Sequence, residues 1–222
     1  MPQLLLELFS EEIPARMQSG AARDLERMAA ERLKAAGLTY DALTTFAGPR
    51  RLTLVVEGLP AATPDREEEL KGPKTLAPEQ ALDGFLRKTG LTRDQLVERD
   101  GVFFAVISQK GRATAELIPD MVDHIVRNFP WPKSMRWGEA SASSASLRWV
   151  RPLHGIVAML GEEIVPVAID CIESGATTFG HRFHHPGPIT LGGAQDYVEK
   201  LKACHVVVDQ EEREAIIRSG AV

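Results

Sequence analysis

The sequence contains 222 residues, of which 44% are hydrophobic and 26% are charged, and its formal net charge is −5 at pH 7. This length suffices to bury a core, as one large domain or two small ones. The acidic balance argues against indiscriminate coating of nucleic acid, so a polyanion must meet a local cationic patch. The two cysteines give no disulfide framework or zinc-type spacing. No apolar run is long enough to cross a bilayer, and we expect a cytoplasmic protein that engages no membrane.

The first part of the chain alternates between strand and helix patterns. The apolar run that begins at Leu4 predicts a buried strand, and Pro14 lies where the first turn of a helix would begin. Apolar residues then recur at helical spacing until Gly37, a residue type that commonly follows the end of a helix. This order is typical of an antiparallel or mixed sheet with helices on one face. The expected elements are a strand at residues 4–9, a helix at 15–36, and strands at 42–47 and 52–56.

A proline-containing stretch at residues 59–65 marks a seam in the chain. We accordingly divide the sequence into a strand-helix-strand-strand subdomain at residues 1–62 and an α+β region at residues 63–222. The predicted fold class is α+β, with mixed or antiparallel sheets and packed helices. The last helix is too short to be stable alone, so we expect the chain to be the N-terminal part of a longer protein. The elements expected in the second region are helices at 78–89, 114–128, 194–203 and from 209 onward, and strands at 102–107, 148–150, 156–160, 164–169, 179–184 and 205–208.

All three tryptophans lie in one basic stretch, which we call the basic–aromatic segment (residues 127–154). This segment holds five Lys or Arg residues and one acid, whereas the rest of the chain holds 21 basic against 30 acidic residues. Aromatic rings interleaved with guanidinium groups suit RNA, because cations meet phosphates while flat groups stack on bases. The alternative is that Trp131, Trp137 and Trp149 anchor a core beside ordinary surface arginines.

Three histidines lie in the Gly-His-Arg-Phe-His-His stretch at residues 180–185. Imidazole is a common zinc ligand, but a catalytic site usually needs three protein ligands that converge on one point. If this stretch is extended, His181 and His185 share one face while His184 points to the other. A polar loop, an RNA contact or a subunit contact therefore competes with the metal interpretation, and we expect no metal site.

Signals for catalysis are weak in this sequence. There is no glycine-rich phosphate loop, and no serine or cysteine has the setting of an activated nucleophile. Neighbouring acids at residues 11–12 and 67–69 do not face one substrate, so they are interpreted as solvated structure. The basic stretches at residues 48–51 and 71–74 are interpreted as turns able to touch phosphate. We expect no catalytic residue in this chain.

Several short segments, taken in chain order, resemble one family. The resemblance is to the N-terminal part of the β subunit of the bacterial heterotetrameric glycyl-tRNA synthetase, and it runs through essentially the whole chain. Two departures are Gly155 and Phe179, where the family often has an aromatic residue and an arginine. The segments that carry the resemblance are residues 5–8 with 10–14, 48–52, 71–73, 84–85 with Lys88, 133–138, 151–154 and 180–184.

The resemblance implies a subunit of glycine–tRNA ligase that does not itself catalyse. In that family the α subunit carries the active site, which uses ATP with Mg²⁺, and the β subunit binds tRNA. No cofactor is then expected in this chain. The implied partners are the α subunit, in a heterotetramer of two α and two β subunits, and tRNA(Gly), but not DNA.

The sequence offers a set of candidate RNA contacts. Trp137 and Phe183 are candidates either for stacking on bases or for packing in the core. A protein-interaction scaffold and a histidine-dependent metallohydrolase are the alternative functions. The predicted RNA-binding residues are Arg50, Arg51, Lys133, Arg136, Trp137, Arg148, Arg151, His181 and Arg182.

Overall fold

The computed structural model describes residues 1–221, together with the side chains of all of these except residues 66, 68, 108, 109 and 140. The chain forms two compact units, which we call unit 1 (Met1–Ala62 with Ala113–Val222) and unit 2 (Thr63–Arg112). The division expected from the sequence differs from this one, because the chain leaves unit 1 near residue 62 but returns to it at residue 113. Val222, the last residue of the expected α+β region, lies outside the described residues.

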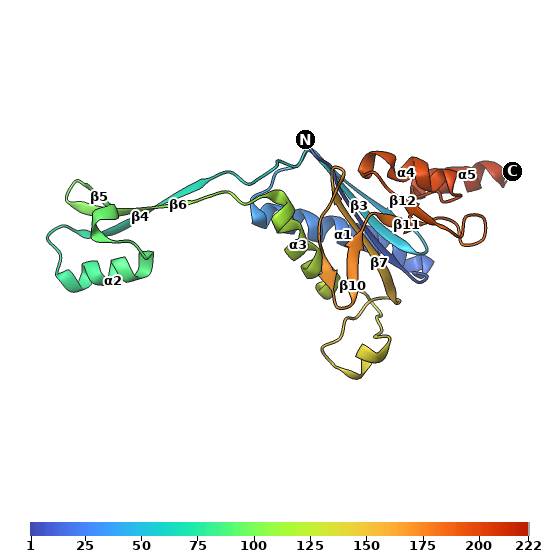
Figure 1. The fold of residues 1–222 in the computed structure, drawn as a ribbon, viewed down its shortest axis with the longest axis horizontal. Coiled ribbons are helices and arrows are strands. Elements are labelled where there is room, and N and C mark those ends of the chain that lie inside the picture. The colour runs from blue at the N-terminus through green and yellow to red at the C-terminus, as the bar shows by residue number, and fades with distance from the viewer. Residues whose placement is uncertain (222) are drawn as a thin grey trace. The chain divides into compact units, whose positions relative to one another are not determined.

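Unit 1 is built on a mixed sheet with the strand order β2-β3-β1-β7-β10-β9, of which Figure 1 labels β3, β7 and β10. The short strand β8 pairs with the C-terminal end of β7. All neighbouring pairs are antiparallel except β7 and β10, which run parallel. A separate two-stranded sheet joins β11 and β12. The strands are β1 (Leu4–Ser10), β2 (Ala42–Ala47), β3 (Arg51–Glu57), β7 (Leu153–Leu160), β8 (Glu163–Ile164), β9 (Ala168–Ile169), β10 (Ile172–Gly175), β11 (Thr177–Phe179) and β12 (Pro188–Thr190).

Strand β1 is the central strand of this sheet and is buried on both faces. Leu4, Leu6 and Leu8 belong to one hydrophobic cluster, while Leu5 belongs to a second cluster that includes Tyr197. Because successive side chains of a strand point to opposite faces, the two clusters lie on opposite sides of the sheet. A strand covered on both faces needs a continuous apolar run, which explains the leucine-rich sequence.

Helices cover both faces of the sheet of unit 1. The sequence prediction of these helices is confirmed, including the end of α1 at Gly37, which adopts a left-handed φ of 77°. Asp209 caps the last helix by accepting hydrogen bonds from the backbone N–H groups of Glu211 and Glu212. None of the helices in the described residues is long and apolar enough to span a membrane. The helices are α1 (Ala15–Ala36), α3 (Thr114–Asn128), α4 (Ala194–Ala203) and α5 (Gln210–Gly220), with a short 3-10 helix η2 (Glu139–Ala142).

Unit 2 is a three-stranded antiparallel sheet in the order β4-β6-β5, with helix α2 packed on it. A Cβ at Gly72 would lie 2.6 Å from the Phe85 ring and 2.9 Å from the Phe103 carbonyl oxygen, so only glycine lets α2 approach this strand. The Lys-Gly-Pro stretch is thus part of a strand, and its prediction as a basic turn was wrong. The elements are β4 (Arg66–Lys74), α2 (Glu79–Thr89), the 3-10 helix η1 (Arg93–Gln95), β5 (Leu96–Arg99) and β6 (Val102–Gln109).

Two strand predictions in the second half fail for local reasons. The strand expected at residues 164–169 is broken into β8 and β9 around Pro166, which has no N–H group to donate to a sheet. The strand expected at residues 179–184 ends at Phe179. A turn follows it, in which the His185 N–H donates to the His181 carbonyl oxygen over 2.9 Å.

Two further strand predictions are also wrong. Residues 148–150 form only an isolated bridge, between Met135 and Trp149. Residues 205–208 form a connection between α4 and α5, and this connection begins with His205 in a left-handed conformation of φ 62°. The α+β class with mixed and antiparallel sheets is nevertheless confirmed.

Candidate nucleic-acid interface

Three of the segments that carry the family resemblance meet where β1 ends. Strands β3 and β7 flank β1, and both begin at this point because they run antiparallel to β1. The Ser10 N–H donates to the Arg50 carbonyl oxygen over 2.8 Å, and the Glu11 N–H donates to the Pro152 carbonyl oxygen over 2.9 Å. Backbone hydrogen bonds therefore join residues 10–14, 48–52 and 151–154 into one surface.

The Glu11 carboxylate lies at the centre of this surface and faces two arginine side chains and one histidine. Its Oε1 lies 3.0 Å from His154 Nε2 and 3.7 Å from Arg50 Nη2, and its Oε2 lies 3.6 Å from Arg182 Nη2. Arg182 is also 3.5 Å from the Glu12 carboxylate. Both acid side chains are solvent-exposed, as expected from the sequence, and both also contact arginine side chains.

Arg50 is the most enclosed of the cations that surround Glu11. Its guanidinium carbon lies 4.7 Å from the centre of the Phe9 ring, a cation–π arrangement. Burial lowers the pKa of Arg50 below its ordinary value, and the neighbouring Glu11 carboxylate acts in the opposite direction. The side chain keeps 25% of its surface exposed, so it remains available to an anion.

Arg51, the next residue, points into the interior and is only 5% exposed. Its Nη2 donates to the Phe179 carbonyl oxygen over 2.6 Å, and its Nη1 lies 3.8 Å from the buried Glu7 carboxylate. This arginine pairs with a buried acid, so little of its side chain is exposed for an RNA contact. Phe179, one of the two departures from the family pattern, takes part through its backbone.

The Glu7 carboxylate is the centre of a buried polar network on one face of β1. It accepts hydrogen bonds from the hydroxyls of Thr178 and Tyr197. Tyr197 Oη is also 2.7 Å from Thr53 Oγ1. Burial, followed by the nearby Glu7 charge, raises the pKa of Tyr197 well above its ordinary value. The network fixes α4 to the sheet through polar contacts.

The turn that carries the sequence Gly-His-Arg-Phe-His-His is held by its own first histidine. His181 Nδ1 accepts from the backbone N–H groups of Phe183 and His184 over 3.2 Å each. A Cβ at Gly180 would lie 2.8 Å from Cys204 Cβ, so glycine permits the close approach of this turn to the end of α4. The His181 N–H also donates to the Cys204 carbonyl oxygen over 2.9 Å. His181 is therefore primarily a residue that forms the turn.

The histidine rings of this turn lie beside each other at tilted angles, and His184 also lies beside His205. The rings of His181 and His184 are 4.6 Å apart, and those of His184 and His205 are 5.5 Å apart. Among the described residues, no group of three or more His, Cys, Asp or Glu side chains is arranged to hold a metal ion. The geometry thus gives the metallohydrolase alternative no support.

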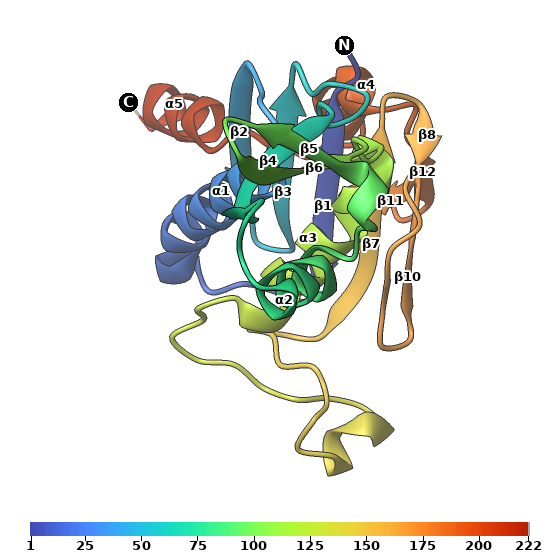
Figure 2. The same cartoon turned by 90° about the vertical axis from the view of Figure 1, so that its left-hand side faces the viewer.

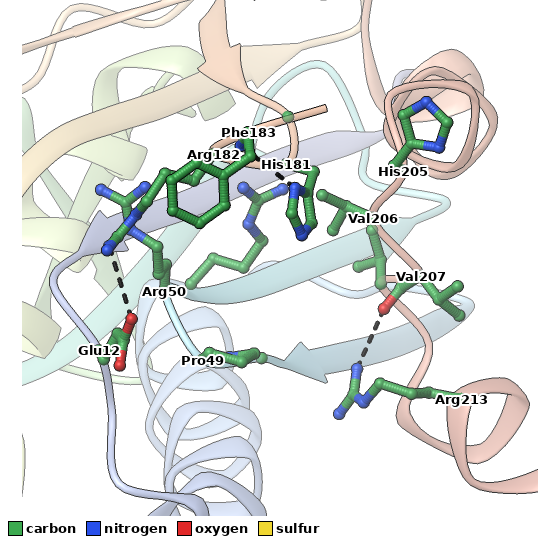
Figure 3. A pocket seen from close by; sticks show the side chains of 14 residues that line it. Glu12, Pro49, Arg50, His181, Arg182, Phe183, His205, Val206, Val207 and Arg213 are labelled. Atoms are coloured by element: carbon green, nitrogen blue, oxygen red, sulfur yellow. Dashed lines mark hydrogen bonds and ion pairs between the residues drawn. The ribbon is translucent and has the colours of Figure 1, made fainter. Parts of the chain in front are cut away.

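A pocket of about 370 Å³ lies between the turn at residues 48–51, the turn at residues 180–183 and the connection at residues 205–208 (Figure 3). We call it the arginine pocket. Arg213, from α5, donates to the Val207 carbonyl oxygen over 3.0 Å and so fixes that connection. The lining combines arginine side chains with valine and proline surfaces. It brings together four of the predicted residues, Arg50, Arg51, His181 and Arg182.

The tryptophans of the basic–aromatic segment serve mainly as core anchors. Trp149 is fully buried, and its ring lies 5.0 Å from the ring of Trp131 and 5.0 Å from that of Phe129. Trp137 is half-buried and packs against the same cluster. The alternative interpretation of these residues as core anchors is therefore confirmed for Trp149, and the packing of Trp137 limits its use as a stacking platform.

The predicted cations of the same segment differ in exposure, and two of the exposed ones are also hydrogen-bonded. Arg148 Nε donates to Ser134 Oγ over 3.2 Å, and Arg151 Nη1 donates to the Val150 carbonyl oxygen over 2.8 Å. Arg136 donates to the Ser144 carbonyl oxygen over 2.8 Å and so closes the loop that contains η2, which Figure 2 shows extending from the sheet of unit 1. Lys133, Arg148 and Arg151 are exposed. These three side chains are the accessible cations among the predicted contacts in this segment.

The sequence of this chain matches a known protein family over nearly its whole length. The family model described as "Glycyl-tRNA synthetase beta subunit" matches residues 4–222. The chain belongs to this family. The resemblance found in the sequence is thereby confirmed, and the family is one of aminoacyl-tRNA synthetase subunits.

Three relatives within the family are named "Glycine--tRNA ligase beta subunit". The relative from Phenylobacterium zucineum is 60% identical over 222 residues, which is 100% of this chain and 32% of the relative. Those from Paracoccus denitrificans and a Ruegeria species are each 52% identical over 229 residues, which is 100% of this chain and 33% of each relative. The chain thus spans about a third of the length of these curated relatives.

Sequence reasoning missed several residues of the interface. Glu7 offered a signal, because a carboxylate within an apolar strand needs a buried cation or hydrogen-bond donors. His154 belonged to a quoted motif but was not among the predicted contacts. Glu11 belonged to a recognised segment, but its partner His154 comes from a distant part of the chain, as do the partners of Tyr197 and Arg213.

Proposed function

We propose that this chain is a tRNA-handling region of a glycine–tRNA ligase β subunit. In this proposal it binds tRNA(Gly) and places the acceptor end for an α subunit, which uses ATP with Mg²⁺ to join glycine to the tRNA. The assembly is a cytoplasmic heterotetramer of two α and two β subunits. The observation that carries the proposal is the family match over residues 4–222.

The arrangement of basic side chains supports a binding role. Arg50, His154 and Arg182 surround Glu11, and Arg151 lies three residues before His154 on the same stretch. Guanidinium groups suit phosphate because they offer paired donors in a fixed plane. Binding energy gathered over such a surface serves to position a substrate, which raises the rate of a reaction performed elsewhere.

Charge reversal at the exposed cations tests this proposal. A complete β subunit that contains this chain, assembled with its α subunit, would carry Lys133→Glu and Arg151→Glu, singly and together. We expect weaker tRNA binding and a shallower dependence of log affinity on log salt, by roughly 0.7 to 0.9 per lost phosphate contact. Binding would be measured by fluorescence anisotropy at low and high salt.

A matched control separates tRNA binding from general electrostatics. Arg23→Glu makes the same charge change on an exposed position of α1. This variant should leave the dependence of log affinity on log salt unchanged. Normal tRNA affinity and charging in both test variants would instead support the protein-interaction scaffold, in which these motifs serve folding and the α contact.

A further inference from the structure

The arginine pocket has the size and lining of a site for one small ligand. Its volume of about 370 Å³ is near the lower end of the range of ligand pockets, roughly 300 to 1,000 Å³. Its wall includes Pro49, Val206 and Val207, which face the arginine side chains across the opening in Figure 3. A site of this size accommodates one small ligand with a flat group and a charged group. It is too small for a double helix.

The charge of the lining favours an anion. Four arginines and Glu12 line the pocket. Arg51 is committed to the buried Glu7, but Arg50 and Arg182 contact their carboxylate partners only at 3.5 to 3.7 Å. Charge-assisted hydrogen bonds are shorter, about 2.7 to 2.9 Å, so a phosphate can compete for these two guanidinium groups.

Phe183 gives the opening an aromatic edge. Its side chain is 79% exposed although the backbone around it is fixed by the Gly180 contact and by His181. A single exposed aromatic residue is ordinary on a protein surface. Here the ring lies beside Arg50 and Arg182 at the pocket, as Figure 3 shows. A rigid ring next to guanidinium groups is the combination that binds unpaired bases.

We propose that the arginine pocket binds one unpaired nucleotide of RNA. Its phosphate pairs with Arg50 and Arg182, and its base stacks on Phe183 against the wall formed by Val206 and Val207. This inference rests on the proposed function, because the RNA is the tRNA that this function supplies. An acidic peptide would satisfy the arginines but has no flat group to occupy the space beside the ring.

The test uses the complete β subunit assembled with its α subunit. Binding of a short single-stranded RNA and of an RNA duplex of the same composition would be measured by anisotropy at one fixed salt concentration. Phe183→Ala should weaken single-strand binding roughly five- to hundred-fold, the range that one base–aromatic stack gives. Duplex binding should stay within about two-fold, because a duplex offers no free base.

Two further variants make the result specific. Phe183→Tyr keeps the ring and should restore most of the single-strand affinity. Ile217→Ala removes another exposed apolar side chain, 63% exposed on α5, and should have no effect. Circular dichroism checks that each variant is folded, as expected for changes at exposed positions.

The outcomes separate this inference from the proposed function. Unchanged single-strand binding in Phe183→Ala, with tRNA binding still weakened by Lys133→Glu and Arg151→Glu, would overturn the pocket assignment and leave the proposed function standing. If an acidic peptide competed for the pocket and single-stranded RNA did not, the pocket assignment would also be overturned. The pocket would then be a protein contact. Failure of the unmodified enzyme to bind tRNA would overturn both.

Discussion

Glu7 shows how a single buried charge constrains this fold. Its carboxylate lies in the central strand, where it contacts Arg51, Thr178 and Tyr197. Removal of one member of a buried ion pair leaves the other charge in the interior without a partner. The stability of unit 1 therefore depends on both members of the pair.

We expect Glu7→Leu to lower the free energy of unfolding by about 3 to 5 kcal/mol, because Arg51 would keep a buried charge without its carboxylate. Urea denaturation followed by circular dichroism measures this change. The double variant Glu7→Leu with Arg51→Met removes both charges and should lose less than the sum of the two single changes. Additive losses would show that the two side chains do not interact.

Tyr197 predicts a dependence of stability on pH in the alkaline range. Its folded-state pKa is raised by burial and by Glu7, so the folded chain keeps a proton that the unfolded chain releases near pH 10. Its contribution is fully present below about pH 10 and is lost as the pH rises above that value. Unfolding free energies measured from pH 8 to pH 11 should fall less steeply in Tyr197→Phe than in the unmodified chain.

At the scale of single elements, two glycines of helix α1 have opposite roles. Gly20 lies inside the helix with no atom within 4 Å of the place where a Cβ would lie, whereas Gly37 ends the helix with φ at 77°. Gly20→Ala should stabilise the chain by about 0.5 to 1 kcal/mol, since alanine loses less backbone entropy in a helix. Gly37→Ala should destabilise it by about 1 to 2 kcal/mol, the cost of a left-handed L-residue.

Thermal denaturation of these two variants provides the measurement, and each variant serves as the control for the other. A shift of the melting temperature in the same direction for both glycines would contradict this assignment. It would show that α1 does not end at Gly37 in solution.

Helices were easier to predict than strands because their signals are local. The apolar spacing of α1 and the cap at Asp209 lie within the elements themselves. Strand β4 depends on a partner farther along the chain, with Leu70 opposite Ala105 of β6, and no residue pattern within β4 identifies that partner. The strand prediction at residues 179–184 failed for another reason. The turn found there forms because the His181 side chain accepts hydrogen bonds from backbone N–H groups.

For the whole molecule, the sequence indicated the segments of the candidate interface but not that they come together in space. The segments at residues 10–14, 48–52, 151–154 and 180–184 were each recognised. Their convergence follows from the position of β1 between β3 and β7, a fact of topology that no single segment contains. Arg50 and Arg51 could not be distinguished for the same reason, because only the placement of Glu7 decides which of them faces inward.

Unit 2 should be removable without loss of unit 1. Ala62 and Ala113 face each other in an antiparallel bridge, and the Thr114 N–H donates to the Ala61 carbonyl oxygen over 2.9 Å. A two-glycine linker can therefore replace residues 63–112 with little strain in the closed loop. We expect this variant to keep the helical circular dichroism of unit 1 and one cooperative unfolding transition. Aggregation or loss of cooperativity would show that unit 1 depends on the removed residues.

The central position of β1 also has a consequence for synthesis on the ribosome. Glu11 and His154 are separated by 143 positions, and Glu7 and Tyr197 by 190. At about 5 to 20 residues per second, a growing chain waits roughly seven to thirty seconds between making β1 and making β7. During that interval one edge of a leucine-rich strand has no neighbour and is open to association with other nascent chains, so this strand is a natural client for a chaperone.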